Sequence, residues 1–275
     1  MYGGQGLPTA SQIHAQYFSK KLYELPALGH RIRPSHIMSG HHHTLQSDIA
    51  RPAIGRLPLP GLRRRSTNAM ALQPGQRALD VGCGTGNSTL ALADVVGGNG
   101  VVHGVDYDLA MIAEAQRRAA IDGLDSWVTY HQANAAALPW PDGYFDASHS
   151  DRVLQHMLDP VCAFGELVRV TRNGGRVVVI DGDWATLNID SDDPENDGRL
   201  AYFQETLQYA NPASGHCLYQ LFADHGLLDI ELDVLPVFER NADAASCWQQ
   251  SRTLFSALEG RFASANVVLI SGRKP

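Results

Sequence analysis

Ala78-Leu79-Asp80-Val81-Gly82-Cys83-Gly84-Thr85-Gly86-Asn87-Ser88-Thr89 is an apolar run that breaks into alternating glycines and then into a helix-like pattern. It predicts a strand, a tight turn and a helix. Gly82, Gly84 and Gly86 lack a Cβ atom, so the backbone can turn sharply there and a ligand can approach the main chain. The start of the following helix offers backbone N–H groups that have no partner within the helix. We therefore expect a small polar ligand at this turn.

The spacing of the glycines distinguishes two classes of ligand. A dinucleotide-binding turn follows the pattern G-x-G-x-x-G, but the third position of that pattern falls on Asn87, and the glycines here run G-x-G-x-G. Asp80 lies inside the strand just before them. In this combination the stretch resembles motif I of class I S-adenosylmethionine-dependent methyltransferases. The resemblance implies an α/β, Rossmann-like fold: a seven-stranded, mostly parallel sheet with its last strand antiparallel and helices on both faces.

A second apolar run, residues 101–105, ends in the carboxylate of Asp106. This is about where an α/β nucleotide fold ends its second strand and holds a ribose through its hydroxyls. A carboxylate suits a diol because both of its oxygens accept hydrogen bonds. The alternative is that Asp106 caps a helix over residues 109–120, a role that Asp108 can take instead. The resemblance implies that Asp106 binds the ribose of the methyl donor.

Residues 128–146 look like the methyltransferase stretch "G-D-A-x-x-L-P-F-x-D-x-x-F-D", with Asn134 in place of the usual Asp and Ala133 in place of the glycine. An amide oxygen can still accept a hydrogen bond from the adenine amino group, and the N–H of Ala135 would reach adenine N1. The resemblance further implies that Asp80 orients the methionine end of the donor and that Tyr107 and Met111 flank the adenine. Donor-binding residues are thus expected in the turn and at the ends of the next strands: Asp80, Gly82, Gly84, Gly86, Asp106, Tyr107, Met111, Asn134, Ala135 and Ser150.

The later part of the chain continues the alternation of strands and helices. We predict a fourth strand over residues 145–150, a helix through Thr171 that Asn173-Gly174-Gly175 ends, and a fifth strand over residues 176–181. Further helices are expected over residues 199–210, 215–225 and 244–258, and strands over residues 228–237 and 266–272. The closing residues 267–275 resemble the "V-x-x-G-R-K-P" strand of the same family, which is inserted antiparallel beside the fifth strand.

We divide the chain into an N-terminal helical and irregular cap, residues 1–70, and a Rossmann-like methyltransferase domain, residues 71–275. An insertion at about residues 183–213 should form part of the acceptor pocket. Apolar spacing predicts a helix over residues 9–25; whether it covers the donor site or only packs on the domain stays open. Residues 51–65 carry five arginines among prolines and glycines, which predicts an irregular, solvated loop in preference to an anion-binding surface.

Composition excludes several classes of protein. A net charge of −7 disfavours a nucleic-acid substrate, and no apolar stretch has membrane-spanning length. The N-terminus lacks the basic and apolar regions of a signal peptide, so we expect a cytoplasmic protein. The four cysteines are widely spaced and argue against a disulfide framework or a zinc site. We expect no metal site at the run His41–His43 either, because adjacent side chains point in different directions and no other ligand type lies at a suitable offset.

These patterns predict transfer of a methyl group from S-adenosylmethionine to an O, N or C atom of a small organic acceptor. The resemblance implies a member of the ubiquinone/menaquinone C-methylase-like (type 11) group of methyltransferases, with a metabolite or natural product as the acceptor. A hydroxyl or acidic carbon would need a base. We favour His156 and His216 for this role among the candidates His149, His156, Asp151, Asp181, Asp183 and His216. The alternatives are an NAD-dependent oxidoreductase and a non-catalytic donor-binding protein of the same fold. The acceptor stays open, as does the oligomeric state, with a homodimer among the options.

Overall fold

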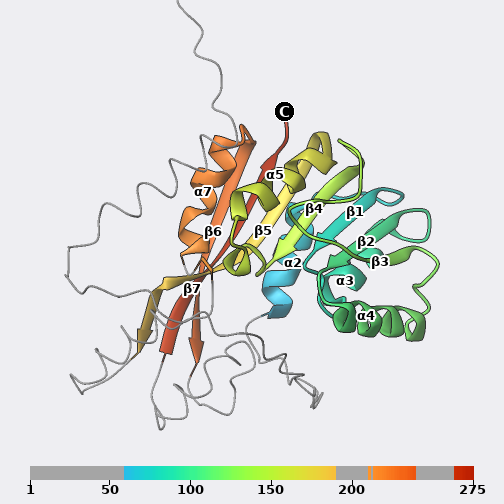
Figure 1. Cartoon of the computed structure of the whole chain (residues 1–275), viewed down its shortest axis with the longest axis horizontal. Helices are drawn as coiled ribbons and strands as arrows, with labels where there is room; N and C mark the ends of the chain where they lie inside the picture. Colours follow the sequence, from blue (N-terminus) through green and yellow to red (C-terminus); the bar gives the residue numbers. More distant parts are fainter. Residues whose placement is uncertain (1–58, 190–209, 212, 240–262) are drawn as a thin grey trace, which may run out of the picture. The chain divides into compact units, whose positions relative to one another are not determined.

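The computed structural model describes residues 59–189, 210–211, 213–239 and 263–275 (Figure 1). Its strands are β1 (Arg77–Val81), β2 (Val101–Asp106), β3 (Val128–Gln132), β4 (Phe145–Asp151), β5 (Thr171–Ile189), β6 (Leu228–Glu239) and β7 (Ala263–Arg273). They form one seven-stranded sheet in the order β3-β2-β1-β4-β5-β7-β6. The pairs among β1 to β5 are parallel, whereas β7 runs antiparallel to both β5 and β6. The predicted fold class, including the antiparallel last strand beside the fifth, is therefore confirmed.

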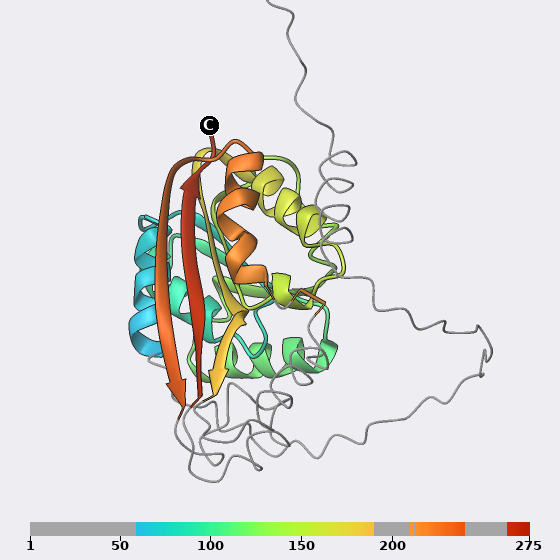
Figure 2. The ribbon, with the colours of Figure 1, turned by 90° about the vertical axis from the view of Figure 1, so that its left-hand side faces the viewer.

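Helices cover both faces of the sheet. They are α2 (Leu59–Ala69), α3 (Asn87–Val96), α4 (Leu109–Ile121), the single 3-10 turn η1 (Leu154–His156), α5 (Pro160–Val170) and α7 (Ser214–Asp224). α2, α3 and α4 lie on one face, and α5 and α7 lie on the other, as the view along the β6 edge in Figure 2 shows for α2 and α7. Parallel strands joined by helices leave their carboxyl ends at one edge, which is where open α/β sheets bind ligands.

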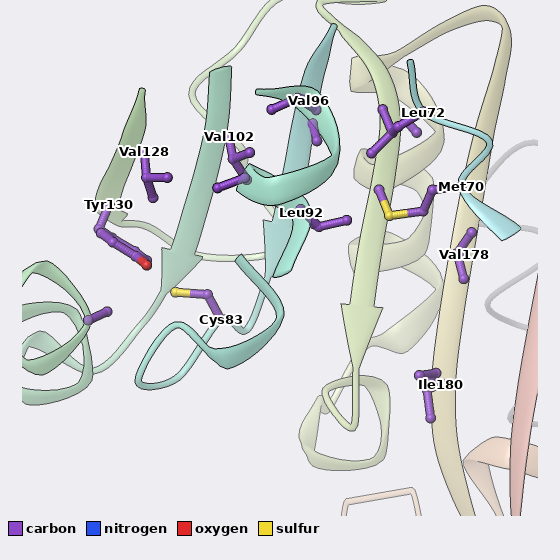
Figure 3. Close-up of a cluster of buried hydrophobic side chains, with 14 of the residues drawn as sticks. Met70, Leu72, Cys83, Leu92, Val96, Val102, Val128, Tyr130, Val178 and Ile180 are labelled. Carbon is purple, nitrogen blue, oxygen red and sulfur yellow. The ribbon is translucent and has the colours of Figure 1, made fainter. Parts of the chain in front are cut away.

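The main hydrophobic core fills the space between the sheet and the helices α2, α3 and α4. Figure 3 shows part of it, with Val102 and Val128 on neighbouring strands and Leu92 and Val96 on α3. On the opposite face, the rings of Phe164 (α5) and Phe222 (α7) are fully buried, with their centroids 4.7 Å apart. Burying each such side chain stabilises the fold by roughly 1.5–3 kcal/mol, so both layers of helices are held to the sheet.

The prediction of an irregular loop up to residue 65 is wrong for its last part, because residues 59–69 form the helix α2. Proline is tolerated in the first turn of a helix, where its missing N–H needs no partner. Leu62 and Ser66, one helical turn apart, are buried, whereas Arg64 and Arg65 are exposed. α2 packs against β5 and β7, although it precedes residue 71; the division of the chain at residue 70 stays a prediction.

The glycines at 174 and 175 do not end a helix as predicted. α5 already ends at Val170, and its C-cap residue Thr171 is in an extended conformation and starts β5. The register between β4 and β5 shifts between the pairs Phe145↔Thr171 and Ala147↔Arg176. Gly174 has φ 73°, and a Cβ atom on Gly175 would lie 2.5 Å from the carbonyl oxygen of Asp146. The two glycines therefore allow the irregular pairing between β4 and β5. β5 also continues to Ile189, well past the predicted end at Asp181.

Several expectations lie outside the described residues: the helices over residues 9–25, 199–210 and 244–258, the run His41–His43, and Arg51 and Arg56. In the part of the chain that the structure describes, no helix is long and apolar enough to cross a membrane. The same part contains no group of three or more His, Cys, Asp or Glu side chains arranged to hold a metal ion.

Candidate active site

The glycine turn between β1 and α3 has the geometry that its sequence predicts. Gly82, Gly84 and Gly86 have φ values of 71°, 51° and 85°, in the left-handed region that favours glycine. The N–H groups of Gly82 and Cys83 both donate to the carbonyl oxygen of Val105 on β2, at 2.7 and 2.9 Å. A Cβ atom on Gly82 would lie 2.1 Å from Cγ2 of Val153. The turn is therefore clamped between β2 and the segment that follows β4.

A cavity of about 730 Å³ opens beside this turn, at the carboxyl ends of β1, β2 and β4. Its walls come from four stretches that are far apart in the sequence: the end of β1 with Gly82, the end of β2 with Tyr107, the loop after β3 and the segment after β4. The lining residues are Val81, Gly82, Val105, Asp106, Tyr107, Ala133, Asn134, Ala135, Ala136, Arg152, Val153, His156, Met157, Leu158 and Asp159.

Asp106 and Asp108 divide the two roles that the sequence left open. The Oδ2 atom of Asp106 accepts a hydrogen bond from the N–H of Gly84 at 2.9 Å, and its Oδ1 atom accepts one from the N–H of Asp108 at 2.9 Å. Asp108 is the N-cap of α4, with its Oδ1 atom accepting from the N–H of Ala110 at 2.7 Å. Asp106 therefore ties the glycine turn to the end of β2 and faces the cavity.

The loop after β3 holds itself in place. Oδ1 of Asn134 accepts from the N–H of Ala136 at 2.9 Å, and the carbonyl oxygen of Asn134 accepts from the N–H of Ala137 at 2.9 Å. The N–H of Ala133 donates to the carbonyl oxygen of Asp106 at 3.1 Å. Within the described residues the N–H of Ala135 makes no hydrogen bond. Asn134 thus shapes the loop, and Ala135 presents a backbone donor at the cavity wall.

Asp80 lies beneath the turn and does not line the cavity. It is 1% exposed, its Oδ2 atom accepts from Oγ1 of Thr89 at 2.6 Å, and its Oδ1 atom lies 2.9 Å from Nδ1 of His149. Burial opposes a charge on His149, but the hydrogen bond and the charge of Asp80 outweigh it and raise the pKa of His149 above its ordinary value. Asp80 therefore joins β1, β4 and α3 under the glycine turn and acts as a positioning residue.

Replacement of Thr89 by Val tests this buried network. Val has nearly the shape of Thr but cannot donate, so the carboxylate of Asp80 would lose one of its two side-chain partners in a buried place. We expect the free energy of unfolding, measured with urea, to fall by about 1–2 kcal/mol. Ser88→Ala is the matched control, because the Ser88 hydroxyl makes no hydrogen bond within the described residues. Equal stability of Thr89→Val and wild type would contradict the assignment.

Only some of the remaining sequence-predicted residues line the cavity. Tyr107 lines it with a 78% exposed ring, and His156 lines it from η1. Gly86 is the N-cap of α3, where a Cβ atom would meet Oη of Tyr130 at 2.5 Å. His216 lies on the first turn of α7, with its Nδ1 atom 3.7 Å from Oδ2 of Asp183. The predicted residues that are not part of the cavity lining are Asp80, Gly84, Gly86, Met111, Ser150 and His216.

A family model described as a methyltransferase domain matches residues 72–241. The chain belongs to this methyltransferase family. A demethylmenaquinone methyltransferase from Anoxybacillus flavithermus is 35% identical over 125 residues, which cover 46% of this chain and 52% of that protein. An O-methyltransferase from Aspergillus sclerotiorum is 34% identical over 168 residues, 59% of this chain and 61% of that protein. The chain spans about half the length of the curated relatives it matches.

The methyltransferase fold is also similar to the crystal structure of the YcgJ protein from Bacillus subtilis. The TM-score is 0.60 at 19% sequence identity, and the match covers 78% of this chain and 98% of that one. Membership of the methyltransferase family favours methyl transfer over the NAD-dependent oxidation that the glycine cluster alone left open.

In the wall of the cavity that follows β4, the sequence singled out His156 but not the residues that hold the wall in place. Arg152 has φ 59°, an uncommon conformation for a residue with a side chain, and its N–H donates to the carbonyl oxygen of Ile180 at 2.7 Å. Its Nε atom also lies 3.0 Å from Oδ1 of Asp151. Asp159 caps α5 by accepting from the N–H of Cys162 at 2.9 Å. The pair Asp159-Pro160 belongs to the run after the fourth strand that resembles the family's "H-x-x-D-P" segment, and Pro160 begins α5.

Proposed function

We propose that this chain is an enzyme that transfers a methyl group from S-adenosylmethionine to a small organic acceptor. The single observation that carries the proposal is the meeting of three elements at one cavity: the glycine turn, the carboxylate of Asp106 and the backbone of the loop after β3. The names of two relatives support the proposal: one is a demethylmenaquinone methyltransferase, whose named substrate is a quinone, and the other is an O-methyltransferase.

The residues present fit the donor. A volume of about 730 Å³ lies within the usual range of small-molecule sites. Each oxygen of Asp106 has one hydrogen bond from the backbone and keeps a second lone pair for a ribose hydroxyl. The N–H of Ala135 can donate to adenine, and the exposed ring of Tyr107 offers a flat surface beside it. Asn134 can contribute its second lone pair, because its Oδ1 atom already accepts from Ala136.

The sulfonium donor supplies the methyl group in an in-line displacement, for which alignment of the reacting atoms is the main requirement. The chain's own contribution is the wall beyond the donor, where Met157 and Leu158 offer apolar surface to an acceptor. His156 is the imidazole that lines the cavity among the described residues. Burial and the neighbouring charge of Arg152 lower the pKa of His156, so its ring is neutral at pH 7 and above.

Calorimetric titration tests the donor and excludes the main alternative. We expect S-adenosylhomocysteine to bind and NADH not to bind; binding of NADH alone would overturn the proposal. Mass spectrometry of metabolite extracts incubated with the enzyme and a methyl-labelled donor then identifies the acceptor. Binding of the donor without any labelled product would favour a non-catalytic protein of the same fold.

Asp106→Ala is expected to weaken binding of S-adenosylhomocysteine about 30-fold, or about 2 kcal/mol, because it removes the ribose acceptor and the tie to the N–H of Gly84. Asp108→Ala is the matched control. It removes the cap of α4 at a cost of about 1 kcal/mol in stability but should leave the affinity within a factor of about three. Equal affinity of Asp106→Ala and wild type in the calorimeter would remove Asp106 from the donor site.

A further inference from the structure

Gln155 is a buried residue next to His156 in the segment after β4, and its side chain contacts three groups. It is 3% exposed. Its Oε1 atom lies 3.0 Å from Nε1 of Trp184 and 3.3 Å from the backbone N of Gly182, both on β5. Its Nε2 atom lies 3.1 Å from Nε2 of His156, the imidazole that lines the cavity.

The two contacts with β5 determine which way the amide of Gln155 faces. The indole N–H of Trp184 and the backbone N–H of Gly182 can only donate. The amide atom next to them must therefore be the oxygen, and the NH₂ group must face His156. An amide flip would place the NH₂ group against two donors and the oxygen against His156, so both hydrogen bonds to β5 would be lost.

The orientation of Gln155 in turn determines where the proton of His156 lies. An amide NH₂ group only donates, so Nε2 of His156 must accept and carries no proton. A neutral imidazole has one N–H, which is then on Nδ1. We propose that Gln155 fixes His156 as the Nδ1–H tautomer and occupies its basic lone pair, so that His156 is not the base that removes a proton from the methyl acceptor.

The backbone of Gln155 is held as firmly as its side chain. Its N–H donates to Oδ2 of Asp181 at 3.0 Å, and its carbonyl oxygen accepts from the N–H of Asn211 at 2.9 Å. A Cβ atom on Gly182 would lie 3.0 Å from Oε1 of Gln155 and 2.7 Å from Nε1 of Trp184, so the amide fits closely against β5. Gln155 is thus a positioning residue that connects β5 to His156.

The second half of the proposal rests on the proposed methyl transfer and narrows the class of acceptor. The basic lone pair of His156 is engaged by Gln155, and any further hydrogen bond of the neutral ring is donated by Nδ1–H. This arrangement suits an acceptor whose nucleophilic atom needs no proton removed by His156. An acidic phenol or enol that is already ionised fits this description, as does an unprotonated amine.

Nitrogen-15 NMR of the histidine-labelled full chain tests the tautomer without donor or acceptor. At pH 8 we expect a protonated-type shift for Nδ1 of His156 and an unprotonated-type shift for its Nε2; His156→Gln assigns the signals. His225 is an internal standard, since its Nδ1 atom lies 2.8 Å from the carbonyl oxygen of Leu221, which can only accept. A wild-type spectrum with the proton on Nε2 of His156 would overturn the proposal.

Gln155→Glu reverses the direction of the bond to His156. A carboxylate keeps the shape and the acceptor for Trp184 but cannot donate, so we expect the proton of His156 to appear on Nε2. Gln220→Glu adds the same charge at an exposed position of α7 and should leave the His156 signals unchanged. An unchanged tautomer in folded Gln155→Glu would contradict the role of Gln155. If that variant does not fold, the wild-type spectrum still decides the tautomer.

His156→Asn tests the role in the reaction, because the Asn amide can donate near the position of Nδ1 but is not basic. We expect its kcat with the acceptor identified by mass spectrometry to stay within about 10-fold of wild type, whereas loss of a general base would lower kcat by about 100-fold or more. A fall of that size would overturn the conclusion that His156 is not the base. Failure of methyl transfer itself would appear as absence of product in wild type, with the NMR result intact.

Discussion

Gly82→Ala is expected to lower the affinity for S-adenosylhomocysteine by about 100-fold or more and to destabilise the fold by about 2–5 kcal/mol. The new Cβ atom would lie 2.1 Å from Cγ2 of Val153, a distance that two non-bonded carbon atoms do not tolerate. Val153 also lines the cavity, so relief of the clash moves the wall after β4 away from the turn. The φ of 71° adds a conformational cost for any residue with a side chain.

Gly123→Ala separates these two effects. Gly123 follows α4 with φ 68°, and a Cβ atom there would meet nothing within 4 Å. It therefore carries the conformational cost alone, about 1–2 kcal/mol, and should bind S-adenosylhomocysteine like wild type. Calorimetry and urea unfolding measure both quantities on each variant. If Gly82→Ala bound the ligand as well as Gly123→Ala does, the close contact between the turn and Val153 would not matter for the site.

The contribution of Asp181 to the stability of the protein is expected to fall by up to about 4 kcal/mol as the pH rises from about 4 to about 7. Burial raises the pKa of Asp181 to about 7, against the effect of its hydrogen bonds from Ser214, Gln155 and Gly182. An unfolded aspartate titrates near 3.9. Between these values the folded state holds a proton that the unfolded state has lost, so stability decreases with pH there and is lowest above the folded pKa.

Asp181→Asn should remove this dependence. Asn resembles the protonated acid, and its Oδ1 atom can accept from the N–H of Gln155 and from Oγ of Ser214, as Oδ2 of Asp181 does. Urea unfolding of wild type and variant at pH 5 and pH 8 gives the four free energies needed. We expect the variant to gain relative to wild type at pH 8. Asp94→Asn, on an exposed position of α3, should keep the wild-type pH dependence. The same loss between the two pH values in Asp181→Asn would contradict the prediction.

The sequence was informative where one short stretch determines the local structure. The turn could be predicted because three alternating glycines follow an apolar strand, and all three have positive φ in the structure. The cap at Asp108 could be predicted because Asp is favoured before a helix. α2 was missed because Pro60 and Gly61 are typical of loops, while only Leu62 and Ser66 mark its buried face. Packing against β5 and β7 decides its conformation, and no local pattern contains that information.

The site was predictable to the same degree. The ends of β1, β2 and β3 could be placed because parallel strands bring their carboxyl ends to one edge. The support of the wall after β4 could not, since it depends on the contact of Gln155 with Asp181, 26 residues away, and with Asn211. The position of Asp80 beneath the turn was hidden for a similar reason: its partner His149 lies 69 residues further along the chain.

Asp80 lies outside the cavity, so the support of the glycine turn is separate from the surface formed by residues 152–159. These two parts of the site can therefore be changed independently. Its buried network supports the turn from the side of α3, whereas residues 152–159 form a compact surface on the other side of the turn. Exchange of the residues of that surface for those of a relative is expected to change which substrate is accepted, while the glycine turn and the buried network beneath it stay in place. Libraries for new methylation targets should therefore vary the six remaining positions of residues 152–159, with Val153 and Gln155 kept constant.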